Sequence, residues 1–458
     1  MFKKMTKKEY FAKEKELIGT STVDFDGPVI TGGKGAIGYD LDGKEFLDFA
    51  GQISLLNTGY APEEVVNALK KMAAKLHSCI SADWPYRVEI SIGRKKTEVS
   101  RVALAERLIK ITDKAMPFKK RVIFEVSGAT AVNLATKIAK ISYLRSRGMK
   151  TENFQSLFEK DILIPSEEDC CRFSFLAFEK AFHGRHGEAH FLSTSKTKHL
   201  WAVSSSCAVG RLPFPAPGIG YIGILKKAED LIAKLDKIAP VIALVFEPVQ
   251  GEGGINVPDG KALKALLNYL KIRHNICLIA DEVQTGFGRT GKMFACEHFG
   301  IEPDMIIMSK SLGAGLPIGA VVVNAEKFPD LEPGMHSGSM HANPLAVAAA
   351  IANIDLILKK NLVDRSLYCG EYALRRLKEI AKFHQGITDV RGLGLMIGIE
   401  FETVEYRDRV AKKCKEKGLL IANCGEKVIR MTPPLIVTID EIDKALDIFE
   451  KALEDSKN

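Results

Sequence analysis

LIADEVQTGFGRTGKMFACEHFGIEPDMIIMSKSLGAGLPIGAV, residues 278–321, contains two short apolar runs, and each lies next to a charged side chain. Asp281 lies within the first run, which extends over residues 277–283, while Lys310 follows the second run, residues 305–308, by two positions. Continuous apolar runs of this kind are typical of strands buried on both faces of a parallel sheet. Ligands of such sheets bind outside the carboxyl ends of the strands, and lysine is seldom buried without a partner. The stretch therefore indicates that a carboxylate and an ammonium group face a ligand at one edge of a sheet.

Short apolar runs recur from about residue 120 to 325, with amphipathic helical segments between several of them. This alternation predicts an α/β fold with a mostly parallel sheet. The last two runs are joined by a glycine-rich loop, which predicts one antiparallel pair. The runs are VIFEV (122–126), FLAFEKAF (175–182), ALVFEPV (243–249), CLIADEV (277–283), MIIM (305–308) and AVVVN (320–324).

Two further parts of the chain differ from this pattern. Residues 29–49 predict an N-terminal hairpin that turns at Asp42-Gly43. The chain after about residue 340 is rich in helical patterns, with a short β-like stretch at 394–401, and it predicts a smaller second domain.

The composition is that of an ordinary globular protein, with 458 residues, 46% hydrophobic residues and a net charge of +8. The densest basic stretch, residues 1–17, lacks the apolar core of a signal peptide, and no apolar run approaches the length of a membrane span. Of nine cysteines only Cys170 and Cys171 are adjacent, and no C-x-x-C pair occurs, which argues against a disulfide framework or a structural zinc site. We expect a cytoplasmic protein that binds neither nucleic acid nor membrane.

Three groups at predicted strand ends point to one ligand. Ser127-Gly128-Ala129 precedes a helix and is an anion site in outline, although small residues are also common there for packing. The carboxylate of Asp281 can pair with a cationic group of a ligand, and the alternative is a structural salt bridge within the protein. Burial can lower the pKa of a lysine and make Lys310 a nucleophile, although a surface role is commoner for a lone lysine. Pyridoxal 5′-phosphate has the matching phosphate, ring nitrogen and aldehyde.

An ordered series of motifs along most of the chain resembles the class III aminotransferases, which are pyridoxal-phosphate enzymes of fold type I. The 278–321 stretch is similar to their cofactor-lysine signature. The other motifs are GKGAIGYDLDGKEFLDFAGQ (33–52), SGATAV (127–132), AFHGR (181–185), FEPVQGEGG (246–254), HSGSMHANPLA (336–346) and VIRMTPPL (428–435).

The resemblance implies a two-domain α/β architecture. A large cofactor-binding domain, residues 61–334, would hold a mostly parallel mixed sheet flanked by helices. A smaller α+β domain would combine an N-terminal segment, residues 1–60, with the C-terminal part, residues 335–458.

The resemblance also implies cofactor contacts. Lys310 would be the Schiff-base lysine and proton shuttle, Asp281 would pair with the pyridinium nitrogen, and Gln284 would contact the phenolic oxygen. The remaining contacts would be Ser127, Gly128 and Ala129 at the phosphate, Phe182 and Val283 on the two ring faces, and Ser339 at the phosphate of a neighbouring subunit. That last contact implies a homodimer or a higher even oligomer.

The implied reaction is transfer of an amino group from an ω-amino acid to 2-oxoglutarate. Arg185 would bind the distal carboxylate of a 4-aminobutyrate-like donor, with ornithine-like and lysine-like donors also open. Glu252 would pair with Arg430 when an amine end is presented and would release it for an α-carboxylate. The alternative is an amino-acid racemase or epimerase of the same family, whose second acid tends to be an aspartate where this chain has Glu252. A non-catalytic binding or scaffold protein is a third reading, but such a protein would not require a lysine, an aspartate and an anion-binding turn that converge on one point.

The departures from the family pattern bear on the substrate rather than on the cofactor, and a histidine-rich segment does not indicate a metal site. Three histidines occur in FHGRHGEAH (182–190), but the two glycines weaken the helix that such ligands would need and no acid completes an H-E-x-x-H motif, so no metal site is expected there. The departures from the family pattern are Tyr60, Thr130, Asn133, Met340, His341 and Ala342.

Overall fold

A computed structural model describes residues 5–19, 27–80, 84–93, 95–150, 172–196 and 207–457. The adjacent cysteines 170 and 171 lie outside the described residues. Within the described part of the chain, no helix is both long and apolar enough to span a membrane.

The largest sheet has seven strands in the order β6-β12-β11-β10-β9-β7-β8. β12 runs antiparallel to both of its neighbours, while the other pairs are parallel. Two antiparallel pairings in succession leave β6 pointing the same way as β11, so six strands share one direction. Their bounds, in sheet order, are Lys120–Glu125, Gly319–Asn324, Met305–Met308, Cys277–Asp281, Val241–Phe246, Phe173–Phe178 and Cys207–Leu212.

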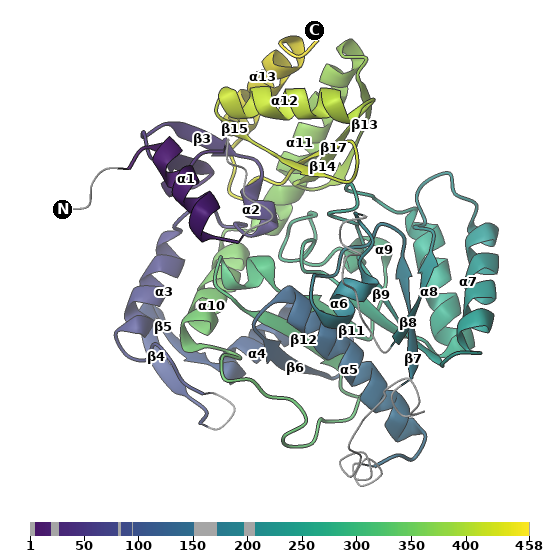
Figure 1. The fold of residues 1–458 in the computed structure, drawn as a ribbon. Coiled ribbons are helices and arrows are strands. Elements are labelled where there is room, and N and C mark those ends of the chain that lie inside the picture. The colour runs from purple at the N-terminus through teal and green to yellow at the C-terminus, as the bar shows by residue number, and fades with distance from the viewer. Residues whose placement is uncertain are drawn as a thin grey trace.

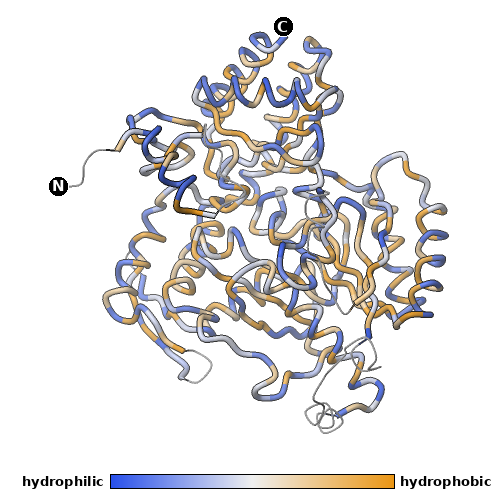
Figure 2. Tube along the Cα trace, in the orientation of Figure 1, coloured by the Kyte–Doolittle hydropathy of each residue, from blue (hydrophilic) through white to orange (hydrophobic). Residues whose placement is uncertain are grey.

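Helices cover both faces of this sheet (Figure 1). Alternate residues of one strand belong to different core clusters: Phe175 packs on the side of α5 (Gly128–Ser146), while Leu176 packs on the side of α7 (Tyr221–Leu235) and α8 (Gly260–His274). The central strands β9 to β12 are mostly apolar in Figure 2, because both of their faces are buried.

A smaller α+β part joins the two ends of the chain. One of its sheets contains strands from both ends, because β3 (Glu45–Asp48) pairs in parallel with β15 (Leu419–Leu420). β1 (Ile30–Lys34) and β2 (Ile37–Asp40) complete that sheet. The other sheet comprises β13 (Ile387–Leu393), β14 (Met396–Phe401), β17 (Val428–Met431) and β16 (Ala422–Cys424), with helices α11 (Leu362–Phe383), α12 (Val404–Glu416) and α13 (Ile439–Glu454).

The remaining elements belong to neither the seven-stranded sheet nor the two sheets of the smaller part. Helix α10 (Pro344–Lys359) packs against α3 (Glu63–Ala73), α4 (Arg101–Ile111) and the 3-10 turn η4 (Lys310–Gly313). The other elements are α1 (Lys7–Leu17), α2 (Gly51–Ser54), β4 (Arg87–Ile92), β5 (Lys95–Ser100), α6 (Gly187–Leu192) and α9 (Cys296–Phe299).

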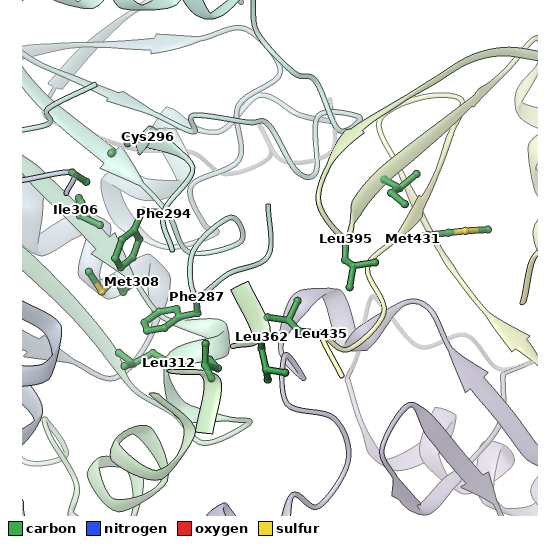
Figure 3. Close-up of a cluster of buried hydrophobic side chains, with 14 of the residues drawn as sticks. Phe287, Phe294, Cys296, Ile306, Met308, Leu312, Leu362, Leu395, Met431 and Leu435 are labelled. Carbon is green, nitrogen blue, oxygen red and sulfur yellow. The ribbon is translucent and has the colours of Figure 1, made fainter. Parts of the chain in front are cut away.

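A continuous hydrophobic cluster connects the large sheet to the C-terminal sheet. Figure 3 shows Phe287 and Met308 near the large sheet, with Leu435 leading toward Leu395 and Met431 on the other side. All five side chains are nearly or completely buried. The two parts therefore share apolar packing next to the ends of β10 and β11.

Most predicted strands are confirmed, including the antiparallel pair of β11 and β12 and the hairpin between β2 and β3. The predicted run at 175–182 is too long, because the strand ends at Phe178 and a turn follows, with Lys180 at φ 61°. The strand at 207–212 was not predicted. The division of the chain into domains at residues 60 and 334 stays a prediction.

Candidate active site

A cavity of about 330 Å³ opens where the sheet strands end. Because β6, β7, β9, β10 and β11 point the same way, the residues that follow them meet at one edge of the sheet. Ten of the twelve predicted site residues line this active-site cavity: Ser127, Gly128, Ala129, Phe182, Arg185, Glu252, Asp281, Val283, Gln284 and Lys310.

The turn after β6 forms the beginning of α5. Ser127 is the N-cap: its hydroxyl accepts from the amide of Thr130 at 3.2 Å, and the Thr130 hydroxyl accepts from the amide of Ser127 at 3.1 Å. The amides of Gly128 and Ala129 have no hydrogen-bond partner among the described residues, as expected for a first helical turn. This turn thus offers free N–H groups and the positive end of a 19-residue helix to an anion.

Asp281 is the last residue of β10 and is 4% exposed. Its Oδ2 lies 2.8 Å from Nδ1 of His183, and its Oδ1 accepts from the amide of Val283 at 3.1 Å. His183 is itself buried and lines the cavity. The carboxylate is therefore held in one orientation by two partners.

Sequence reasoning missed the role of His183 as the partner of Asp281. The available signal is its position directly after the predicted ring-stacking residue Phe182, at the end of a predicted strand.

Lys310 follows β11 and begins the turn η4, with its amine at the cavity. Burial and, to a smaller extent, the charge of Arg430 lower the pKa of Lys310 to about 8, against the opposite effect of three nearby carboxylates. With its carboxamide oxygen toward the cations, Gln284 accepts from Lys310 Nζ at 3.0 Å and from Arg430 Nη1 at 3.3 Å. A lysine in this setting can take up and release a proton near neutral pH.

A second buried carboxylate, Glu247, also lines the cavity after β9. It accepts from the amides of Phe182 at 3.3 Å and Gly251 at 3.4 Å. Burial and the charge of Asp281 raise the pKa of Glu247 to about 8. The sequence placed Glu247 inside a family motif but gave no pattern from which its burial could be inferred.

Glu252 lies between two cations. Its Oε2 is 3.3 Å from Nη1 of Arg430, and its Oε1 is 2.5 Å from Nζ of Lys196. The side chain of Arg430 is 1% exposed and that of Lys196 is 30% exposed. Burial raises the pKa of Glu252, but the two cations outweigh it, so the net pKa lies below its usual value. Arg430 is therefore connected to the cavity by its contacts with Glu252 and Gln284, which both line it. Lys196 is a partner of Glu252 that could not be predicted from the sequence.

Arg185 is exposed at the cavity, and its guanidinium lies 5.3 Å from the ring centre of Phe182. No carboxylate of a described residue forms an ion pair with it. A cation in this position is available for a negatively charged ligand.

Ser339 does not line the cavity of the single chain and is exposed on the loop before α10. Among the departures from the family pattern, the Tyr60 hydroxyl donates to Asp48 Oδ2 at 2.8 Å, and Asn133 Oδ1 accepts from the amide of Ala189 at 3.0 Å.

The sequence profile of the class III aminotransferase family matches residues 22–453. The chain is 35% identical over 429 residues to an acetylornithine aminotransferase of Methanocaldococcus jannaschii, and the match covers 94% of each chain. It is 32% identical over 475 residues to an alanine/serine racemase of Pyrococcus horikoshii, covering 98% of this chain and 90% of the relative. The solved ornithine aminotransferase of Toxoplasma gondii, described with partial occupancy of PLP at its active site, matches with a TM-score of 0.80 at 25% identity, covering 99% of this chain and 96% of that one.

Proposed function

Because the chain belongs to the class III aminotransferases, we propose that it transfers the terminal amino group of an ω-amino acid to 2-oxoglutarate. The observation that supports this proposal most strongly is the position of Glu252, which lies between Arg430 and Lys196 at the cavity that holds Lys310. A carboxylate with two cationic partners can leave one of them for the other, and so can expose a substrate-binding arginine.

Pyridoxal 5′-phosphate is the cofactor of this family, and the residues of the cavity fit it. The unpartnered amides of Gly128 and Ala129 suit its phosphate. Asp281 presents a fixed carboxylate for the ring nitrogen, and Lys310 presents an amine for the aldehyde. Gly128 is also sterically suited to this place, because a Cβ there would lie 3.1 Å from a methyl group of Val283.

When bound, the cofactor supplies an aldehyde that condenses with amines and a ring that accepts an electron pair from the substrate carbon. Lys310 would hold the cofactor and then carry the proton that moves between substrate and cofactor carbons. Its pKa of about 8 matches this task, because both protonation states are accessible near neutral pH. Asp281, oriented by His183, would keep the ring nitrogen protonated.

Two substrates of different charge pattern must use the same cavity. Glutamate and 2-oxoglutarate present a carboxylate next to the reacting carbon, which would bind Arg430 after Glu252 has moved toward Lys196. An ω-amino acid presents no carboxylate there, so Glu252 would stay on Arg430. The far carboxylate of either substrate would reach Arg185, which has no ion-pair partner among the described residues.

Racemisation is the second candidate, because one relative is an alanine/serine racemase. It requires a second acid on the face of the substrate opposite Lys310. Glu252 is the residue at the corresponding position, but its pKa is held below the usual value by Arg430 and Lys196. A carboxylate that stays ionised is a poor proton donor, which favours transfer over inversion.

An amino-donor screen tests the proposal. The holoenzyme is given 2-oxoglutarate with ornithine, N-acetylornithine, 4-aminobutyrate, 5-aminovalerate or lysine, and glutamate production is measured. Single enantiomers of alanine and serine are tested in parallel for inversion. We expect glutamate from at least one ω-amino donor, and inversion without glutamate production would refute the proposal.

A second copy of the chain would complete the cofactor site. Ser339 is exposed outside the cavity of its own chain, which is compatible with a contact to the phosphate bound by a neighbour. We expect a homodimer or higher even oligomer in sedimentation experiments, and we expect Ser339→Ala to release the cofactor faster than the wild type.

A further inference from the structure

Glu125, His336 and His341 form a cluster outside the active-site cavity. Glu125 is the last residue of β6, two residues before Ser127. His336 and His341 lie on the loop between β12 and α10. The side chain of Glu125 is 5% exposed, and those of the two histidines are 15% and 18% exposed. Residues more than two hundred positions apart in the sequence therefore meet at the base of the predicted phosphate turn.

The ligand-type atoms of this cluster converge. Nε2 of His336 lies 2.9 Å from Oε1 of Glu125, and Nε2 of His341 lies 3.2 Å from Oε2. The two imidazole rings are stacked, with centres 5.2 Å apart. One ligand atom from each residue lies within 4.8 Å of the other two. Zinc–nitrogen and zinc–oxygen bonds are about 2.0–2.2 Å long, so a single ion can reach all three side chains after small adjustments.

Hydrogen bonds within the cluster do not fully satisfy the side chains of Glu125 and His336. Nε2 of His336 is enclosed and lies at ion-pair distance, 2.9 Å, from a carboxylate oxygen of Glu125, but it is not aligned for a hydrogen bond with any described residue. A buried nitrogen facing a carboxylate without a shared proton is unfavourable. A cation between the two atoms would satisfy both.

We propose that Glu125, His336 and His341 bind one divalent transition-metal ion of the zinc class. Two imidazoles and one carboxylate favour Zn²⁺ or Co²⁺ over Mg²⁺ and Ca²⁺, which prefer oxygen ligands. Three protein ligands leave a fourth position for water. The bound ion would connect the 335–341 loop to the end of β6. We infer a structural role for it, because none of its ligands lines the active-site cavity.

The test is metal binding to the purified holoenzyme. The protein is dialysed against a chelator that leaves the cofactor bound, and Zn²⁺ is then titrated and measured by calorimetry and elemental analysis. The variants are His341→Ala and His336→Gln, and the matched control is His77→Ala, which removes an exposed histidine elsewhere. We expect one Zn²⁺ per chain in the wild type and control. In the two variants the affinity should fall by at least the roughly 10–100-fold that loss of a supporting residue costs a metal site.

Two further measurements distinguish this site from adventitious binding and from misfolding. The Co²⁺-loaded wild type should lack the near-ultraviolet charge-transfer band of a cobalt–thiolate bond, which would reveal binding to cysteines instead. Zn²⁺ should raise the melting temperature of the wild type and of His77→Ala, but not that of Glu125→Gln, whose cofactor absorbance reports that the fold is intact. The proposal is overturned if the wild type takes up no stoichiometric Zn²⁺, if the ion is bound by thiolate, or if the ligand variants bind it as tightly as the control.

Discussion

Glu252→Ala and Lys196→Met are expected to shift the donor preference in opposite directions. In the proposed mechanism, glutamate displaces Glu252 from Arg430 before its α-carboxylate binds there. Glu252→Ala removes that competition and leaves Arg430 available. Lys196→Met removes the alternative partner, so Glu252 should remain on Arg430 and glutamate should bind less well.

The contacts set the size of each effect. The contact between Glu252 and Arg430 is 3.3 Å long, and the carboxylate side chain is 14% exposed. A hydrogen bond between charged groups contributes about 1.5–3 kcal/mol. We take the lower end, because Arg430 keeps Gln284 as a partner. Glu252→Ala should therefore raise the glutamate-to-ω-amine preference about tenfold.

Lys196 is more exposed, at 30%, so its ion pair with Glu252 is worth at most about 1 kcal/mol. Lys196→Met should lower the same preference by up to about fivefold.

The assay is a stopped-flow half-reaction without 2-oxo acid, in which cofactor absorbance is followed after mixing with glutamate or with an ω-amine. Lys226→Met, an exposed lysine on α7, is the matched control. The ratio of kcat/KM values for the two donors is compared among folded variants. Equal losses with both donors would show that Glu252 only stabilises its turn, and the gating role would be refuted.

Three other changes are expected to act on the site. His183→Phe removes the 2.8 Å partner of Asp281, the proposed partner of the cofactor nitrogen, and should lower kcat/KM about tenfold or more with cofactor still bound, as steady-state kinetics and absorbance will show. Gly251→Ala should displace Gln284 and reduce kcat, because its Cβ would lie 1.6 Å from the side-chain carboxamide of Gln284, whereas Gly223→Ala meets no atom within 4 Å and should be active. Because the pKa of Lys310 is lowered from 10.5 to about 8, its folded form binds fewer protons than the unfolded chain between those values, and stability rises with pH there. Lys310→Met should therefore stabilise the cofactor-free protein at pH 7, with a gain that fades toward pH 10.5 in urea unfolding.

Much of the large sheet could be predicted from the sequence, because its strands are buried on both faces and appear as uninterrupted apolar runs. The strand at 207–212 could not, since CAVGRL contains a glycine and an arginine. A glycine is needed at position 210, because a side chain there would collide with Leu176 and Leu235, and these neighbours are known only from the packed structure.

The residues of the active site likewise include some that the sequence predicts and some that it does not. Lys310 and Asp281 stand at the ends of recognisable strands, and the direction of the strands brings them together. Lys196 reaches Glu252 across 56 positions, and Glu125 meets His336 and His341 across more than two hundred. No local pattern encodes such pairs, because they depend on how loops from different strands fold over the sheet.

The central claim is that Lys310 holds pyridoxal phosphate and carries the proton of the transfer. Borohydride reduces the C=N bond between a lysine and the aldehyde carbon of the cofactor, and it fixes the cofactor to that lysine. The treated protein is digested and its peptides are identified by mass spectrometry. We predict a modified peptide that contains Lys310 and no modification after prior conversion of the cofactor with an amino donor. A colourless protein that takes up no cofactor, or a modification on another lysine, would contradict the account.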